Sequence, residues 1–235
     1  MTTTDSDGWR RRLESRPLLA DHPIALRITL ALWVLGGALF IALAVPVLEA
    51  FVQGVDVVVH QLAVDLEFSP AVRMAVGLDF LGGTWVTVPV MILVGAYLAW
   101  RRRWEGVMYW GLSMLVSQIL IGTTKAAYER SRPPLSLVET TGFSFPSGHA
   151  VAGAAIVIAL VIVLVPAGLR RRNLEMLAAA FAVIMGLSRV YLRTHWLSDV
   201  VAGVALGAAV AVGVAVAMHY VVLWESDRSS GERSP

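Results

Sequence analysis

The sequence predicts an all-α, polytopic membrane protein: a bundle of six transmembrane helices, with short amphipathic helices between spans one and two. Two observations predict this fold class. Hydrophobic residues make up 57% of the 235-residue chain and charged residues only 15%, a balance too apolar for an ordinary soluble domain. The apolar residues also gather in runs of about 20, the length that a helix needs to cross the hydrocarbon core of a bilayer.

Six such runs occur along the chain. A helix is expected for each, because hydrocarbon offers the backbone no hydrogen-bond partners and a helix satisfies them internally. Five runs contain no Asp, Glu, Lys or Arg, and the fifth in order contains only Glu175 near its start and Arg189 near its end. The expected spans are 28–48, 81–100, 106–124, 150–169, 174–192 and 200–223.

The arginines outside the spans predict how the bundle lies in the membrane. With six spans, four arginine groups fall on one side, which the positive-inside rule makes cytoplasmic. The polar segments 1–23 and 224–235 are then cytoplasmic tails, flexible by composition, around a membrane domain at 24–223. A cleaved signal peptide at the first span is the alternative, but its polar lead is long and its apolar run has the length of a full span. The four groups are 10–16, 101–103, 170–172 and 228–233.

The connector between the first two spans is mixed in character. Residues 49–83 place valines and leucines among Asp56, Asp65 and Glu67. One or two amphipathic helices along the outer interface would explain this composition, and an ordinary connector would explain it equally well. The chain has no cysteine, which excludes disulfides and thiolate chemistry.

Basic residues crowd the outer ends of the third and fifth expected spans, against the positive-inside bias. A specific anionic partner explains them better than topology does. The net charge of only +2 argues against nucleic acid as that partner. The residues concerned are Lys125, Arg130, Arg132, Arg189 and Arg193.

Two short segments on this face have side chains suited to binding phosphate. Lys125 and Arg132 can both donate to phosphate oxygens, although a basic pair at a helix end is also typical of a lipid headgroup anchor. Ser147 and Gly148 precede the fourth span, where free backbone N–H groups and the helix dipole favour an anion, with His149 in the first turn. Taken alone, a capped helix with an interfacial histidine explains that segment slightly better.

A third segment ends with His195 and Asp199. Residues four apart on one helix share a face, so this carboxylate can accept a hydrogen bond from one ring nitrogen and leave the other free to act as a nucleophile. A purely structural ion pair is the alternative, but charges at this depth are costly and often functional.

Together the three segments resemble the signature of the type 2 phosphatidic acid phosphatase (PAP2) superfamily, which also includes vanadium-dependent haloperoxidases and bacterial acid phosphatases. That signature is a lysine, six residues and Arg-Pro; then Pro-Ser-Gly-His; then Ser-Arg, five residues, His, three residues and Asp. The chain matches it without departure at 125–133, 146–149 and 188–199. The six expected spans resemble the membrane branch of the family.

The resemblance implies a plasma-membrane hydrolase that removes phosphate from a lipid on the extracytoplasmic side and needs no metal or other cofactor. It implies that His195 attacks phosphorus and forms a phosphohistidine, and that Asp199 orients this histidine and raises its basicity. His149 would protonate the departing lipid oxygen and then activate water. Five residues would hold the phosphate oxygens: Lys125, Arg132, Ser147, Gly148 and Arg189.

Several alternatives stay open at this point. Undecaprenyl diphosphate, phosphatidic acid, phosphatidylglycerol phosphate and polyprenyl-linked sugar phosphates are all candidate substrates, because the motifs bind phosphate and not the lipid tail. A haloperoxidase is disfavoured by the membrane spans, and a scaffold or transporter by the matching motif spacings. Arg130 and Arg193 are expected at the rim, facing either a second phosphate or anionic lipid. His60 and His219 are expected to be structural.

Overall fold

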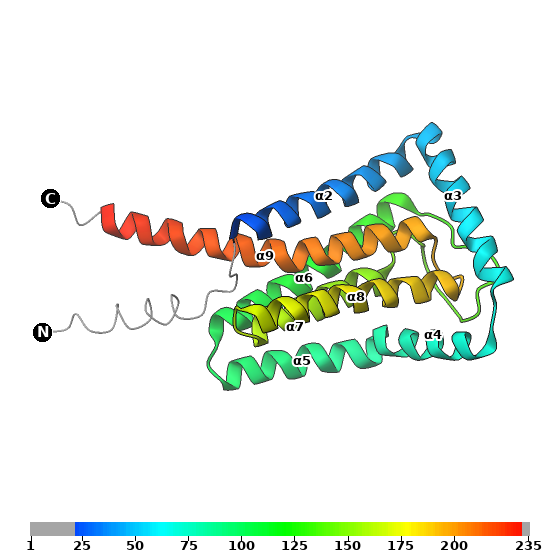
Figure 1. Cartoon of the computed structure of the whole chain (residues 1–235). Coiled ribbons are helices and arrows are strands. Elements are labelled where there is room, and N and C mark those ends of the chain that lie inside the picture. The colour runs from blue at the N-terminus through cyan, green and yellow to red at the C-terminus, as the bar shows by residue number, and fades with distance from the viewer. Residues whose placement is uncertain (1–21, 232–235) are drawn as a thin grey trace, which may run out of the picture.

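The computed structural model describes residues 22–231, which fold into helices joined by short connections and one longer loop, with no strand in that range (Figure 1). The predicted all-α membrane fold is therefore confirmed. The loop, residues 129–147, joins the third expected span to the fourth. The helices are α2 (His22–Ala44), α3 (Pro46–Asp65), α4 (Ser69–Gly82), α5 (Thr84–Trp100), α6 (Trp104–Tyr128), α7 (Gly148–Leu164), α8 (Leu169–Tyr191) and α9 (Leu197–Gly231).

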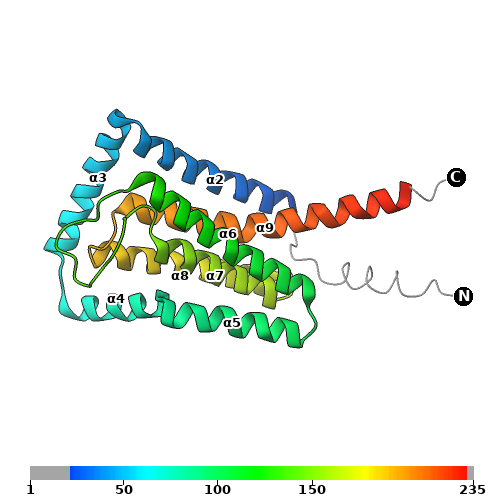
Figure 2. The same ribbon diagram turned by 180° about the vertical axis from the view of Figure 1, so that it is seen from behind.

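Each expected span coincides with a helix, namely α2 and α5 to α9. Among residues 22–231, five helices are long and apolar enough to cross a membrane, or six if the bent pair of α4 and α5 is one span. α3 passes that test of length and composition, but it runs across the ends of α2 and α9 and not along the bundle (Figures 1 and 2). α7 is a shorter apolar helix of 17 residues at the centre of the bundle.

Several boundaries differ from the expected ones. α2 ends at Ala44, four residues early, because Pro46 cannot continue the hydrogen-bonding pattern of a helix and instead occupies the first turn of α3. The connector at 49–83 forms two helices, and α4 meets α5 at an angle of 43°. α9 continues to Gly231, through most of the segment expected as a flexible tail. Residues 1–21 of the other expected tail lie outside the described residues.

The core of the bundle forms where α7 packs against α8 and α9. Small residues on α7 and α9 let the two backbones approach closely, as is common between membrane helices. A methyl group at Gly207 of α9 would lie 2.2 Å from the carbonyl oxygen of Val151, and one at Gly203 would lie 2.9 Å from that of Ser147. These glycines therefore set the distance between the N-terminal ends of α7 and α9.

We predict that Gly207→Ala destabilises the protein, because the added methyl group must force α7 and α9 apart. Overpacking of this kind costs about 1–3 kcal/mol, which corresponds to a fall in the thermal midpoint of about 2–10 °C. The measurement is thermal unfolding of the purified protein in detergent. Gly111→Ala on α6 is the matched control, since nothing lies within 4 Å of the position of its methyl group. Equal midpoints for the two variants would contradict the prediction.

Candidate active site

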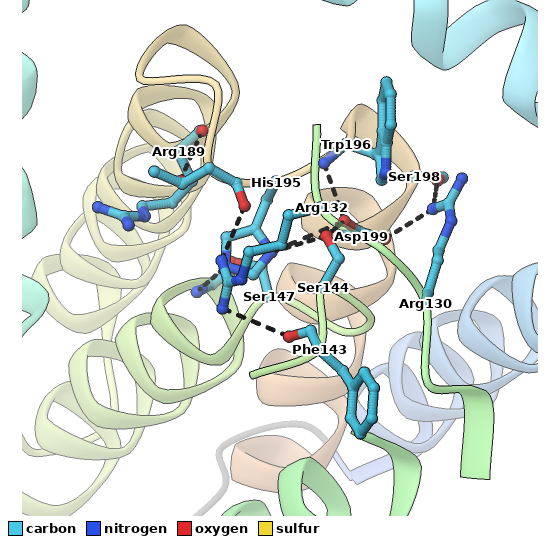
Figure 3. A network of polar contacts seen from close by, with 12 residues as sticks. Arg130, Arg132, Phe143, Ser144, Ser147, Arg189, His195, Trp196, Ser198 and Asp199 are labelled. Carbon is cyan, nitrogen blue, oxygen red and sulfur yellow. Dashed lines mark hydrogen bonds and ion pairs between the residues drawn. The ribbon is translucent and has the colours of Figure 1, made fainter. Parts of the chain in front are cut away.

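The three sequence motifs meet at the end of the bundle that α3 covers. The last turn of α6 and the loop 129–147 supply the first, the start of α7 the second, and the end of α8 with the turn into α9 the third (Figures 1 and 3). A backbone hydrogen bond of 3.1 Å from Ser147 N–H to the carbonyl of Asp199 joins the second motif to the third. The structure thus brings together all eight residues expected at the site.

His195 and Asp199 are paired, but not on one helix as predicted. α8 ends at Tyr191, and Arg193 adopts a left-handed backbone conformation, so the chain turns and His195 lies in the connection before α9. Asp199 lies in the first turn of α9, where its Oδ2 accepts the N–H of Trp196 at 2.8 Å and so caps the helix. His195 Nδ1 lies 3.7 Å from that same oxygen.

The environment of His195 keeps its imidazole neutral. The side chain is 3% exposed, and burial lowers its pKa to about 4 against the opposing effect of Asp199, while the charges of Arg132 and Arg189 lower it further. Arg132 Nη1 lies 3.2 Å from Nε2 of the ring. Because a guanidinium can only donate, Nε2 is the ring nitrogen with the lone pair, and the proton lies on Nδ1, beside Asp199.

Arg130 is buried in an ion network behind Asp199 and does not lie at a rim as predicted. Its Nη1 contacts Asp199 Oδ1 at 2.7 Å, and its Nη2 contacts Asp56 Oδ2 at 2.8 Å. Asp56, on α3, is 1% exposed and also accepts the backbone N–H of Ser198 at 2.9 Å. Arg130 therefore links α3 to the first turn of α9, and Figure 3 shows its contact with Asp199.

The other oxygen of Asp199 also accepts a hydrogen bond from the loop 129–147, through the hydroxyl of Ser144. Asp199 is fully buried, so each of these donors offsets part of the cost of removing its charge from water. The second residue expected at the rim, Arg193, forms an ion pair of 2.7 Å with Glu67. Arg130 and Arg193 therefore both bind carboxylates of the protein, and neither takes the lipid-facing role that was one of the expectations.

Lys125 and Arg132 hold the loop 129–147 against the site. The Lys125 ammonium donates to the carbonyl of Phe143. Arg132 donates to the carbonyls of Thr141 and Gly142, at 2.9 Å each, and to that of Thr194 at 2.8 Å. Backbone carbonyls therefore fix both cations, with the guanidinium of Arg132 beside the histidine (Figure 3).

His149 and Arg189 converge on one carboxylate, Asp79 of α4. His149 Nε2 lies 3.1 Å from Asp79 Oδ1, and Arg189 Nη1 contacts the same oxygen. Arg189 is 3% exposed, yet its Nε has no hydrogen-bond partner among the described residues. Ser147 caps α7 as expected, with its hydroxyl accepting from Ala150 N–H at 3.4 Å. Here too the sequence-predicted residues lie together.

Sequence reasoning missed or misplaced four residues of this site: it gave no role in the site to Asp56, Asp79 and Ser144, and it expected Arg130 at the rim. Three of them are charged, and a charged residue in an otherwise apolar membrane helix or beside one is a signal of function. Asp79 carried that signal, because it stands two residues before an expected span. Ser144 carried none, since a serine in a loop is common.

The fold and the site define a class of membrane protein, an α-helical phosphohydrolase with one buried and one half-buried histidine and a cluster of cationic side chains. Comparison with known families agrees: the model of the PAP2 superfamily matches residues 106–223, half of the chain. The chain belongs to the PAP2 superfamily. It is a multi-pass membrane protein and a lipid phosphate hydrolase.

A sequence comparison and a structure comparison both find a Bacillus subtilis phosphatase that resembles the chain over most of its length. Phosphatidylglycerophosphatase B of strain 168 is 29% identical over 177 residues, which cover 72% of this chain and 85% of the relative. The crystal structure of a transmembrane PAP2-type phosphatidylglycerolphosphate phosphatase superposes with a TM-score of 0.67 at 27% identity, covering 81% of this chain and 93% of the other. The crystal structure of Aquifex aeolicus LpxE shares the fold, with a TM-score of 0.55 at 20% identity over 66% of this chain and 91% of that one.

We predict that Arg130→Gln lowers the thermal midpoint strongly, because it leaves Asp56 and Asp199 buried and unpaired. Breaking a buried ion pair in this way costs about 3–5 kcal/mol. Adding Asp56→Asn to that variant is expected to recover part of the loss, since it removes one of the unpaired charges. Arg73→Gln, at an exposed position of α4, is the control for loss of an arginine. A double variant no more stable than Arg130→Gln would contradict this account of the network.

Proposed function

We propose that this enzyme hydrolyses a phosphomonoester or diphosphate of a lipid on the outer leaflet through a phosphohistidine on His195. One observation carries the proposal: the lone pair of a buried, neutral imidazole lies 3.2 Å from the Arg132 guanidinium, while Asp199 lies behind the opposite ring nitrogen. A phosphate bound by this arginine would place its phosphorus beside the nucleophile. Such positioning is the main contribution that a protein makes to phosphoryl transfer.

In the first step, the lone pair of His195 Nε2 attacks phosphorus and the bond from phosphorus to the lipid oxygen breaks. His149 donates a proton to that departing oxygen. The ring of His195 becomes positively charged, and Asp199 stabilises it through the Nδ1 proton. In the second step, His149 accepts a proton from water, the resulting hydroxide oxygen attacks phosphorus, and the bond from phosphorus to nitrogen breaks. Inorganic phosphate leaves and His195 is regenerated.

The phosphate oxygens are held by cationic side chains and by the start of α7. Lys125, Arg132 and Arg189 supply positive charge, and the buried Nε of Arg189 is a donor without a partner among residues 22–231. The Ser147 hydroxyl and the Gly148 N–H add donors at a helix N-terminus, where an anion is favoured. Fixed donors of this kind stabilise the charge of the transition state, so the proposed mechanism assigns no step to a metal.

We predict that His195→Ala abolishes phosphate release and also prevents covalent labelling by a ³²P-labelled lipid phosphate. The loss of rate is expected to be on the order of 10³-fold or more, as for removal of other nucleophiles. In the wild-type protein, the label should be stable to alkali and labile to acid, which is typical of a phosphoramidate. His219→Ala, on α9 in the half of the helix away from the site, is the control. Labelling of His195→Ala at the wild-type level would refute the nucleophile.

We propose phosphatidylglycerophosphate as the first candidate substrate, because that activity is in the name of the similar Bacillus subtilis protein and in that of the similar Bacillus subtilis crystal structure. Phosphatidic acid and undecaprenyl diphosphate are the competing substrates. The proposed outer location rests on the arginines at 101–103 and 170–172, which lie at the end of the bundle opposite to the site (Figure 1). Both termini would then be cytoplasmic.

We predict that sealed, right-side-out membrane vesicles hydrolyse short-chain phosphatidylglycerophosphate added from outside, in the presence of EDTA. Phosphatidic acid and a short-chain prenyl diphosphate are assayed side by side, and kcat/KM decides the preferred substrate. Vesicles containing His195→Ala give the background. Activity that appears only after the vesicles are permeabilised would refute the outer location, and activity lost in EDTA would refute the metal-free mechanism.

A further inference from the structure

We propose that Asp79 of α4 is a positioning residue: it holds His149 where this histidine can donate a proton to the departing lipid oxygen. The inference rests on the proposed function, since it assigns to Asp79 the support of the histidine that donates the proton. Asp79 lies outside the residues that match the family model, 106–223. Its position against His149 comes from tertiary packing.

The end of α4 lies so close to His149 that only a glycine fits at the point of contact. A methyl group at Gly82, the last residue of α4, would lie 2.6 Å from Cδ2 of the His149 ring and 3.1 Å from Sδ of Met185. Asp79 is one helical turn earlier on the same face of α4. The glycine therefore lets α4 approach until the Asp79 carboxylate reaches Nε2 of His149, at 3.1 Å.

The contact has the distance of an ion pair but not the geometry of a hydrogen bond, since Nε2 of His149 makes no hydrogen bond with any described residue. A small rotation of the ring would turn Nε2 from the carboxylate toward a substrate oxygen. Burial and the charge of Arg189 lower the pKa of His149, and the Asp79 carboxylate opposes them by favouring the protonated imidazole, which is the form that a general acid needs. Asp79 thus supports the proton-donating form of His149 against the effects that disfavour it.

Arg189 also contacts Asp79, and this contact suggests a different role for Asp79, as the counter-ion of a buried arginine. Asp79 Oδ1 also binds Nη1 of Arg189, which is 3% exposed. Were Asp79 only the counter-ion of this buried arginine, its removal would change the binding of every phosphate alike. Support of His149 has a different consequence, because a proton donor matters only when the departing oxygen is strongly basic. The two roles are therefore separable by the leaving group.

The experiment compares two substrates in single turnovers, with release of the first product as the readout. An alkyl lipid phosphate expels a basic alkoxide, whereas a nitrophenyl phosphate carrying an alkyl chain expels a stable aryl oxide that needs no proton. Asp79→Asn is expected to slow release of the alcohol by on the order of 10- to 100-fold, part of the usual contribution of a general acid. Release of nitrophenolate is expected to change by less than about threefold. Asp79→Glu should restore part of the lost rate.

A pair of glycine variants on α4 tests the same contact without removing a charge. Gly82→Ala is expected to displace the His149 ring and to reproduce the leaving-group dependence of Asp79→Asn. Gly77→Ala is the matched control, because nothing lies within 4 Å of its methyl position on the same helix.

Equal losses with both substrates in Asp79→Asn and Gly82→Ala would overturn the role of Asp79 while leaving the proposed function intact. If instead His195→Ala kept its activity, the proposed function itself would fail.

Discussion

The active site depends on close contact between the backbones at the start of α7 and the first turns of α9. Gly203 and Gly207 of α9 face backbone atoms of α7 with no room for a side chain, and Ser147 N–H bonds to the carbonyl of Asp199 at 3.1 Å. This contact fixes the second motif against the third. Because α7 is short and mostly buried, its N-terminus is held rigidly beside His195, where free N–H groups can meet an anion.

Charge pairing around this contact follows from the low polarity of the surroundings. A carboxylate that is buried without a partner is strongly destabilising, so both of the buried ones here meet an arginine, and the half-buried Asp79 meets one as well. Asp199 and Asp56 share Arg130, and Asp79 pairs with Arg189. The remaining cations are Lys125 and Arg132. Their hydrogen-bond partners among the described residues are backbone carbonyls and, for Arg132, the His195 ring, so no carboxylate neutralises their charge directly and it is available to phosphate. The site therefore has an excess of positive charge where a phosphate would bind.

The helices α3 and α4 complete the site, although they lie outside the range that matches the family model. Asp56 reaches Asp199 through Arg130, and Asp79 contacts the histidine at the start of α7. α3 lies across the end of the bundle and α4 along its side, so together they cover the end where the motifs meet (Figures 1 and 2). Covering this end keeps His195 buried and its imidazole neutral.

The sequence by itself determined the membrane fold, the approximate helices and the motif residues, because hydrophobic run length and motif spacing are local properties of the chain. It also placed His149 and His195 at the same end of the bundle. Tertiary structure alone decided which charges meet: Arg130 reaches Asp56, 74 residues earlier, and Asp79 reaches Arg189, 110 residues later. Even the contact between His195 and Asp199 needed the structure, because the chain turns at the left-handed Arg193 and α9 begins only at Leu197, so the two residues do not share the helix that their spacing suggested. Such pairings depend on how closely helices pack, and single glycines such as Gly82 set that distance.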